Sequence, residues 1–345
     1  MSRSSPPLRR ALFGGWTHSW AALPYNLNWA IDPGPEEIDH LRRNPLVVCD
    51  VGARGGAPEE LRSLFPYMVY YAFDADEAES ARLNAQTHPH AEQRVFPRFI
   101  GGETGVTRFH IYAEGGRSSV YLPSERYMEA FGEAAEFRLE QTVELPCITL
   151  DEVVAAEALK PPDMLKLDTQ GSELDILRRS TATLRSAHLV EVEVEFTEMY
   201  EGQPQFHDVA GFFAERGYEL LYLNRQFSQR KEIYGGPARG QITFADALFG
   251  RRADQLDGAS DASLIAYALL LVNYGHRDLA CQVIDRHPQI ARDLPAIERY
   301  FTQRDHGSAA GRAIVSQVDK LAMLWLHLRR DNRFNDDSDR SWPFR

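Results

Sequence analysis

The sequence predicts an α/β fold in which a largely parallel sheet is covered by helices on both faces. Short apolar runs end in turn residues, helical stretches separate these runs, and acidic residues follow several of them. The chain has 345 residues, more than one average domain of about 150 residues. We expect an irregular N-terminal arm over residues 1–44, a main domain over 45–250 and a helical C-terminal extension over 251–345.

The first half of the main domain alternates strands and helices. The apolar run Leu46–Cys49 breaks at a glycine-rich turn, which is typical of a buried parallel strand. A helical stretch, Glu59–Phe65, leads to a second strand, Met68–Phe73. The rest of this half is predicted as one helix and two strands: residues 77–86, 94–100 and 106–112.

The same alternation resumes in the second half of the domain. A strand over Asp163–Asp168 is followed by a helix that begins at Ser172. In the next strand, Leu189–Phe196, apolar residues alternate with three glutamates, which would repel one another on a covered face, so some must face solvent or a polar site. The remaining elements are one helix and two strands: residues 207–216, 218–223 and 242–249.

Charge, cysteine content and hydropathy exclude several classes of protein. Residues 45–250 hold 19 basic and 33 acidic side chains, a balance that repels phosphate backbones, so no nucleic acid partner is expected. The three cysteines are too far apart for a disulfide framework or a cysteine zinc site, which favours a cytoplasmic location. The longest apolar run, Leu264–Val272, has 9 residues. A bilayer requires about 20, so we expect no membrane insertion.

The glycine turn after the first strand limits the ligands that it can bind. A dinucleotide motif would need glycines at 52, 54 and 57, but Arg54 and Ala57 occupy two of these positions, which disfavours NAD and FAD. No G-K-[ST] sequence follows, so the turn is not a Walker A loop either. The pattern that remains is D-x-G-x-x-x-G, formed by Asp50, Gly52 and Gly56.

This pattern and the end of the second strand together indicate a cofactor with an amino acid end and a ribose. Asp50 offers a carboxylate to an amino group, and the glycines let a small zwitterion lie against the backbone. Asp74 ends the second strand, where an acidic residue binds ribose hydroxyls. S-adenosylmethionine has both groups; a turn that binds no ligand is the alternative. The predicted cofactor-binding residues are Asp50, Gly52, Ala53, Gly56, Asp74 and Ala75.

Six stretches in this order resemble the FkbM family of S-adenosylmethionine-dependent methyltransferases. They are CDVGARGG (49–56), YAFDAD (71–76), GGRSSVY (115–121), ITLDEV (148–153), MLKLDTQGSELDIL (164–177) and TFADALF (243–249). The resemblance covers about residues 45–250 and implies a class I, Rossmann-like methyltransferase fold. It also implies an O-methyltransferase whose acceptor is a hydroxyl of a sugar, a glycan or a related natural product.

Two residues depart from the family pattern. Arg54 stands where asparagine is common, and Gln170 replaces the usual glutamate of the K-x-D-x-E-G block. The loss of that acid keeps an alternative open, in which the chain is a catalytically reduced cofactor-binding module that acts as an interaction subunit. An oxidoreductase on the same fold is a further alternative, against which the glycine spacing argues.

Asp168 and Glu195 are the predicted catalytic residues, because both lie at strand ends, where open α/β sheets bind ligands. A carboxylate there would accept the proton of the acceptor hydroxyl. A magnesium ion between the two is the alternative, but Gln170 is a poorer ligand than glutamate, so no metal is expected. Asp168 would otherwise only brace the loop before Ser172. Lys166, in a mostly apolar strand, is expected to pair with a neighbouring acid.

The loop after Gly115-Gly116 and the C-terminal extension each have two interpretations. Arg117, Ser118 and Ser119 are predicted to contact the substrate, with a solvated turn as the alternative. The extension has two apolar rows at helical spacing. We expect them to form core, with a homodimer contact or a partner enzyme's binding surface as alternatives. The rows are Leu264, Ala268, Leu271 and Val272, and Val318, Leu321, Leu324 and Trp325.

Overall fold

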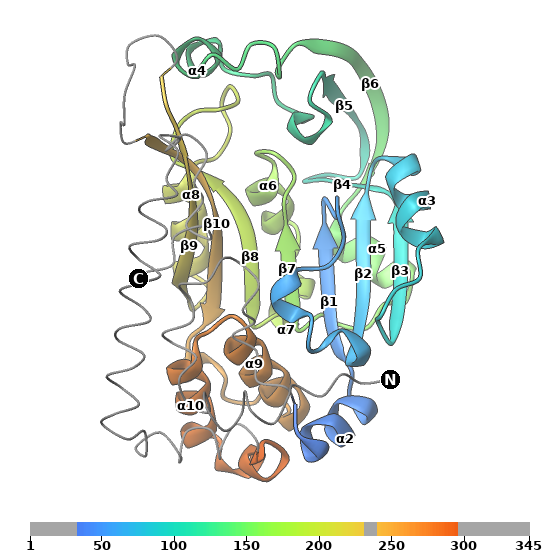
Figure 1. Ribbon diagram of the computed structural model, residues 1–345, viewed down its shortest axis with the longest axis vertical. Coiled ribbons are helices and arrows are strands. Elements are labelled where there is room, and N and C mark those ends of the chain that lie inside the picture. The colour runs from blue at the N-terminus through green and yellow to red at the C-terminus, as the bar shows by residue number, and fades with distance from the viewer. Residues whose placement is uncertain (1–32, 231–239, 296–345) are drawn as a thin grey trace, which may run out of the picture.

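The computed structural model describes residues 33–230 and 240–295, which build a seven-stranded main sheet and a smaller three-stranded sheet (Figure 1). The strands of the main sheet are β1 (Leu46–Val51), β2 (Met68–Asp74), β3 (Glu92–Pro97), β7 (Met164–Leu167), β8 (Leu189–Glu195), β9 (Tyr218–Ser228) and β10 (Gln241–Arg251). Their order is β3-β2-β1-β7-β8-β10-β9. Strand β10 is antiparallel to both of its neighbours, and the other pairs are parallel.

Helices pack on both faces of the main sheet, which confirms the predicted fold class. The first face is covered by α5 (Leu150–Ala156), α6 (Glu173–Arg178), α7 (Thr181–Ser186) and α8 (Phe206–Ala214). The opposite face carries α2 (Pro35–Arg43), α3 (Glu77–Ala85), α9 (Asp261–Asn273) and α10 (Arg277–Arg286). Two separate apolar cores result, one on each side of the sheet.

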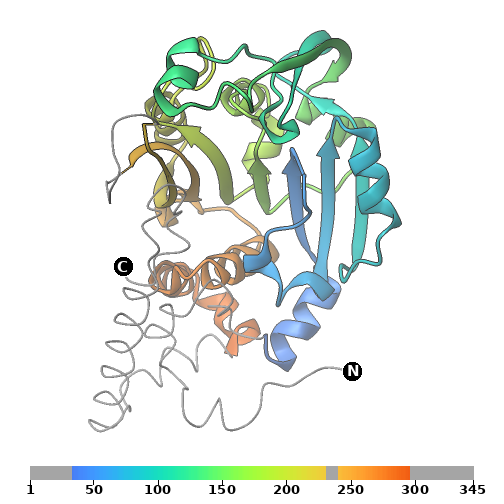
Figure 2. The same ribbon diagram turned by 45° about the horizontal axis from the view of Figure 1, so that its top comes forward.

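The smaller sheet lies at the end of the molecule to which the parallel strands point (Figures 1 and 2). It contains β4 (Phe99–Ile100), β6 (Leu139–Ile148) and β5 (Gly105–Tyr112) in the order β4-β6-β5, and α4 (Glu125–Phe131) lies in the connection between β5 and β6. The prediction missed β6, because the strand is mostly exposed and polar and has no apolar run. This sheet covers the carboxyl ends of the main strands, where ligands bind in open α/β sheets.

Two local expectations were wrong. Residues 35–43, assigned to the irregular arm, form α2, which has a proline in its first turn, acidic residues beside it and arginines in its last turn. The predicted helix Glu59–Phe65 is replaced by two short 3-10 helices, Glu59–Leu61 and Phe65–Tyr67, the second with a proline at its start. Residues 1–32 of the arm lie outside the described part of the chain.

The first apolar row of the C-terminal extension is part of the core, as expected. Leu264, Ala268, Leu271 and Val272 of α9 are at most 1% exposed and pack with strands β1, β2, β7 and β8. In Figure 2 α9 crosses in front of the lower half of the sheet. The second row, residues 318–325, lies outside the described residues.

Within residues 33–230 and 240–295, no helix combines the length and the apolar character that crossing a bilayer requires.

Candidate active site

The glycine turn is bonded directly to the end of β2. The backbone N–H groups of Gly52 and Ala53 both donate to the carbonyl of Phe73, at 2.9 and 3.2 Å. Asp74 is the next residue, and burial raises the pKa of its carboxyl group. The two predicted halves of the cofactor site, the glycine turn and the acid at the end of β2, therefore lie together.

Gly52 also brings this turn against the end of β7. Its φ is +78°, a region that favours glycine, and a Cβ atom there would lie 1.9 Å from the carbonyl oxygen of Asp168. Asp168 in turn donates its backbone N–H to Val51 at 2.9 Å. The turn and the backbone of Asp168 can approach this closely only because position 52 has no side chain.

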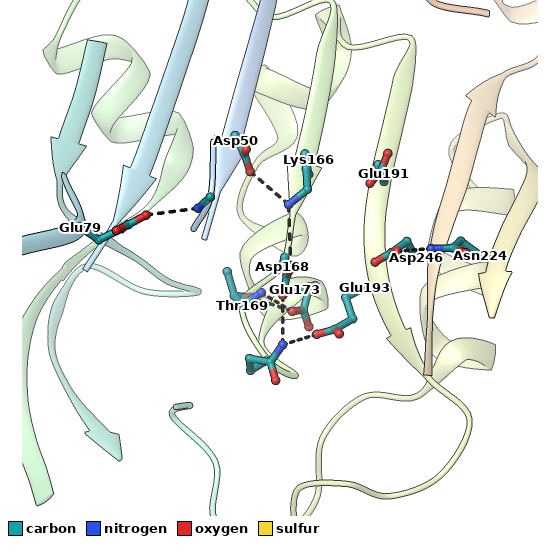
Figure 3. A network of polar contacts seen from close by, with 12 residues as sticks. Asp50, Glu79, Lys166, Asp168, Thr169, Glu173, Glu191, Glu193, Asn224 and Asp246 are labelled. Carbon is teal, nitrogen blue, oxygen red and sulfur yellow. Dashed lines mark hydrogen bonds and ion pairs between the residues drawn. The ribbon is translucent and has the colours of Figure 1, made fainter. Parts of the chain in front are cut away.

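Open backbone follows in the same turn. Gly55 and Gly56 have φ values of +91° and +97°, and a Cβ atom on Gly55 would meet no atom within 4 Å. The N–H of Gly55 donates to Glu79 of α3 at 3.2 Å (Figure 3). Ala53 is fully buried beneath the turn, and Ala75 is half-buried beside Asp74.

Lys166 connects the cofactor side of the site to the catalytic side, as Figure 3 shows. Its Nζ lies 3.5 Å from Asp50 Oδ1 and 4.0 Å from Asp168 Oδ2, which confirms the expected pairing with a neighbouring acid. Asp50 is fully buried and also accepts a hydrogen bond of 2.7 Å from the Tyr70 hydroxyl. Burial raises the pKa of Asp50, while Lys166 and Tyr70 oppose that shift. The role of Asp50 toward a cofactor amino group stays a prediction.

The three glutamates of β8 are all buried, so none of them faces solvent. Glu191 accepts a hydrogen bond from Tyr274 at 2.7 Å, and Glu193 accepts one from Gln170 at 2.6 Å. Glu195 is 2% exposed, and none of the described residues forms a hydrogen bond with its Oε1 atom. Burial raises the pKa of Glu193 and Glu195 well above the usual range, and the charge of Asp168 adds to both shifts. The carboxyl groups of Glu191 and Glu193 thus have polar partners inside the fold.

Two acids contact the loop after β7: Glu173 accepts backbone N–H groups of the loop, and Asp168 accepts a hydrogen bond from the side chain of Gln170. The Glu173 carboxylate accepts the backbone N–H groups of Thr169, at 2.6 Å, and Gly171, at 3.0 Å. Burial raises the pKa of Glu173 to about 7. The side chain of Asp168 is 39% exposed and is thus accessible to a ligand.

Arg117, Ser118 and Ser119 form a packed wall of the site, so the solvated-turn alternative is wrong. Arg117 lies 3.4 Å from Glu133 and over the ring of Phe137. Ser118 accepts the backbone N–H of Tyr112, and Ser119 donates to the carbonyl of Gln170 at 2.6 Å. Contact of these residues with a substrate stays a prediction.

Glu193 and Tyr200, which the sequence analysis did not select, belong to the site, and so does Gln170, which it considered only as a family departure and a poor metal ligand. Gln170 donates to Asp168 and Glu193, and the Tyr200 hydroxyl lies 3.0 Å from its side-chain oxygen. The strict alternation of glutamates along β8 was a usable signal for Glu193. Nothing in the sequence around Tyr200 indicated its position. In the described part of the chain, no group of three or more His, Cys, Asp or Glu residues is arranged to hold a metal ion.

Two features define the class I methyltransferase fold. The main sheet has a single antiparallel strand next to one edge, and the glycine turn lies against Asp74 and Asp168. The FkbM methyltransferase domain matches residues 26–220, more than half of the chain. The chain therefore belongs to the FkbM methyltransferase family.

Two individual proteins are similar to this chain. The 2-O-methyltransferase NoeI of Sinorhizobium fredii (strain NBRC 101917 / NGR234) is 25% identical over 170 residues, which cover 48% of this chain and 70% of that protein. The crystal structure of magnesium protoporphyrin IX methyltransferase (ChlM) from Synechocystis PCC 6803 with bound SAM matches with a TM-score of 0.29 and 9% identity. That match covers 73% of this chain and 100% of the other.

Proposed function

We propose that the protein is an S-adenosylmethionine-dependent O-methyltransferase whose acceptor is a hydroxyl of a sugar, a glycan or a related natural product. The observation that carries the proposal is the meeting of three features at one sheet edge: the glycine turn, Asp74 and the accessible carboxylate of Asp168. The similarity to a 2-O-methyltransferase supports a hydroxyl as the acceptor.

The residues present fit S-adenosylmethionine. Asp74 would hold the ribose hydroxyls, because its carboxylate stands at the end of β2 beside the turn. The backbone of Gly55 and Gly56 would accommodate the amino acid end, because it is open: a Cβ atom on Gly56 would meet only Leu83, at 3.9 Å. Asp50, which pairs with Lys166, would offer its carboxylate to the amino group of the cofactor.

Bound S-adenosylmethionine would supply a methyl group activated by a sulfonium, with the sulfur as the leaving group when an aligned nucleophile attacks the methyl carbon. Asp168 would accept the proton of the acceptor hydroxyl as the new oxygen–carbon bond forms, because a neutral hydroxyl is a weak nucleophile. The products would be a methyl ether and S-adenosylhomocysteine, with the proton on the carboxylate. Glu195 lies deeper and is the second catalytic candidate.

A calorimetric titration with S-adenosylhomocysteine, NAD and ATP, side by side, tests the cofactor. We expect binding of S-adenosylhomocysteine alone. Transfer of a labelled methyl group from S-adenosylmethionine to a panel of glycosides and polyols then tests the acceptor class. Binding without transfer to any hydroxyl acceptor would favour the interaction-subunit alternative, and binding of NAD would favour an oxidoreductase.

The proposal places this reaction in the cytoplasm. Cys49 and Cys147 are buried and form no disulfide within the described part of the chain, which supports a reducing compartment.

A further inference from the structure

Gln170 lies at the centre of the hydrogen-bond network between β7 and β8. Its backbone has a φ of +57°, unusual for a residue other than glycine. The Ser119 hydroxyl donates to its backbone carbonyl at 2.6 Å, and the Tyr200 hydroxyl lies 3.0 Å from its Oε1 atom. Non-glycine residues in this conformation persist where surrounding contacts over-determine them, often at functional sites.

These contacts fix the orientation of the side-chain amide. Nε2 faces two acids, Asp168 Oδ1 at 3.0 Å and Glu193 Oε2 at 2.6 Å, while Oε1 lies beside the Tyr200 hydroxyl, which is also 2.8 Å from the carbonyl of Arg117. The reverse orientation would place a carbonyl oxygen against the carboxylate of Asp168, which can only accept, so the contact to Asp168 determines the orientation. Both N–H bonds of one amide group are therefore used by two acids from two different strands.

A nitrogen shared between two carboxyl groups occupies the position that a bridging cation would take. Asp168 and Glu193 would otherwise repel each other in a largely buried setting. The amide relieves this repulsion without adding charge, and it holds the exposed member, Asp168, in one orientation. Lys166 approaches the other oxygen of Asp168, at 4.0 Å.

We propose that Gln170 is a positioning residue that takes the place of a divalent cation between Asp168 and Glu193 and directs the Asp168 carboxylate toward the acceptor hydroxyl. This inference rests on the proposed function. It predicts that methyl transfer by the parent protein survives EDTA. It also predicts that a carboxylate at position 170 makes the site require a cation, which the Gln170 amide makes unnecessary.

The test compares the melting temperature of the parent, Gln170→Glu and Gln170→Leu, each with and without magnesium or calcium at matched ionic strength and one mildly alkaline pH. Gln170→Glu adds a third carboxylate, an oxygen ligand set that suits these ions. Its melting temperature should fall by about 4 °C or more and recover when the cation is added. The parent and Gln170→Leu should not respond to the cation.

A swapped double variant, Asp168→Asn with Gln170→Glu, is the matched control. Like the parent, it has one amide and one carboxylate at positions 168 and 170, but the two groups have exchanged positions. We expect a melting temperature near that of the parent, no response to the cation, and no methyl transfer, because the carboxylate has left position 168. This variant also decides the matter if Gln170→Glu alone does not fold.

Steady-state kinetics separates positioning from general packing. With an acceptor from the glycoside panel, Gln170→Leu should lower kcat by about tenfold or more while leaving the KM for S-adenosylmethionine unchanged. Any one of three results would overturn the inference. The parent could respond to the cation as strongly as Gln170→Glu, Gln170→Glu could fail to respond, or Gln170→Leu could keep the kcat of the parent. Failure of the parent to bind S-adenosylhomocysteine would instead remove the proposed function and, with it, the catalytic part of this role.

Discussion

The two faces of the main sheet differ sharply although the same strands form both. Along β8, Val190, Val192 and Val194 point into the core under α5–α8, and the three glutamates between them point to the opposite face. That opposite face is itself divided. Its lower half is apolar and lies under α9, whereas its upper half holds the acids, Lys166 and Gln170.

The contrast between the two faces shows what an alternation of apolar and acidic residues indicates when a strand is covered on both sides. Period-two alternation usually marks a strand with one face toward solvent. In this protein both faces of β8 are covered. The glutamates form a buried polar network, and helix α9 covers this face except near the carboxyl ends of the strands. The apolar half supplies stability and the polar half supplies the proposed chemistry. The predictions below address the two halves separately, in order of decreasing effect.

Removal of residues 253–345 should have the largest effect. It deletes α9 and exposes the apolar lower half of the sheet, so we expect loss of cooperative thermal unfolding and low solubility. Leu271→Ala is the graded comparison and should cost about 2–5 kcal/mol in free energy of unfolding, measured by denaturant titration. A truncated protein that stays monomeric and as stable as the parent would show that the two halves are independent.

Asp168→Asn should affect the polar half alone. We expect kcat for methyl transfer to fall by about 10²- to 10⁴-fold, because the amide cannot accept the proton. The Kd for S-adenosylhomocysteine, measured by calorimetry, should stay unchanged. Glu140→Gln on the exposed strand β6 is the control and should match the parent. Equal turnover of Asp168→Asn and the parent would remove Asp168 from the chemistry.

Asp74→Ala should weaken S-adenosylhomocysteine binding by about 10- to 150-fold, the loss of one charge-assisted hydrogen bond. Asp74→Asn keeps a hydrogen-bond acceptor and should lose less. Calorimetry measures both. An unchanged Kd for Asp74→Ala would mean that the ribose is held elsewhere.

Glu195→Gln should have the smallest effect and a defined pH dependence. Because the pKa of Glu195 is raised in the folded state, the native protein holds that proton more tightly than the unfolded chain does, and stability falls as pH rises above about 4.3. The amide cannot ionise, so the variant should melt higher than the parent at neutral pH and match it near pH 4. A parallel shift at all pH values would contradict the assigned cause.

The features that could be predicted from the sequence are those that short, local patterns of residues specify. The run at residues 46–49 and its glycine turn indicated β1 and its ligand-facing end, and Asp74 and Asp168 were found because they follow apolar runs. Gln170 was noticed as a departure from a family pattern and as a poor metal ligand, but not as a hydrogen-bond donor to two acids. Its contacts depend on Tyr200 and Glu193, which tertiary structure brings to it, and no local pattern specifies such a meeting. The same holds for β6, whose partners β4 and β5 determine its conformation.

The position of α9 has a consequence for biosynthesis. The Ser63 hydroxyl donates to Asn273, 210 residues later in the chain, and α9 completes a core that begins with Leu41 of α2. During translation the apolar half of the sheet lacks α9 until the ribosome has made almost 300 residues. Nascent chains with such a surface are prone to aggregate and slow to fold. Chaperone capacity should therefore limit the yield of this protein in a heterologous host more than its final stability does.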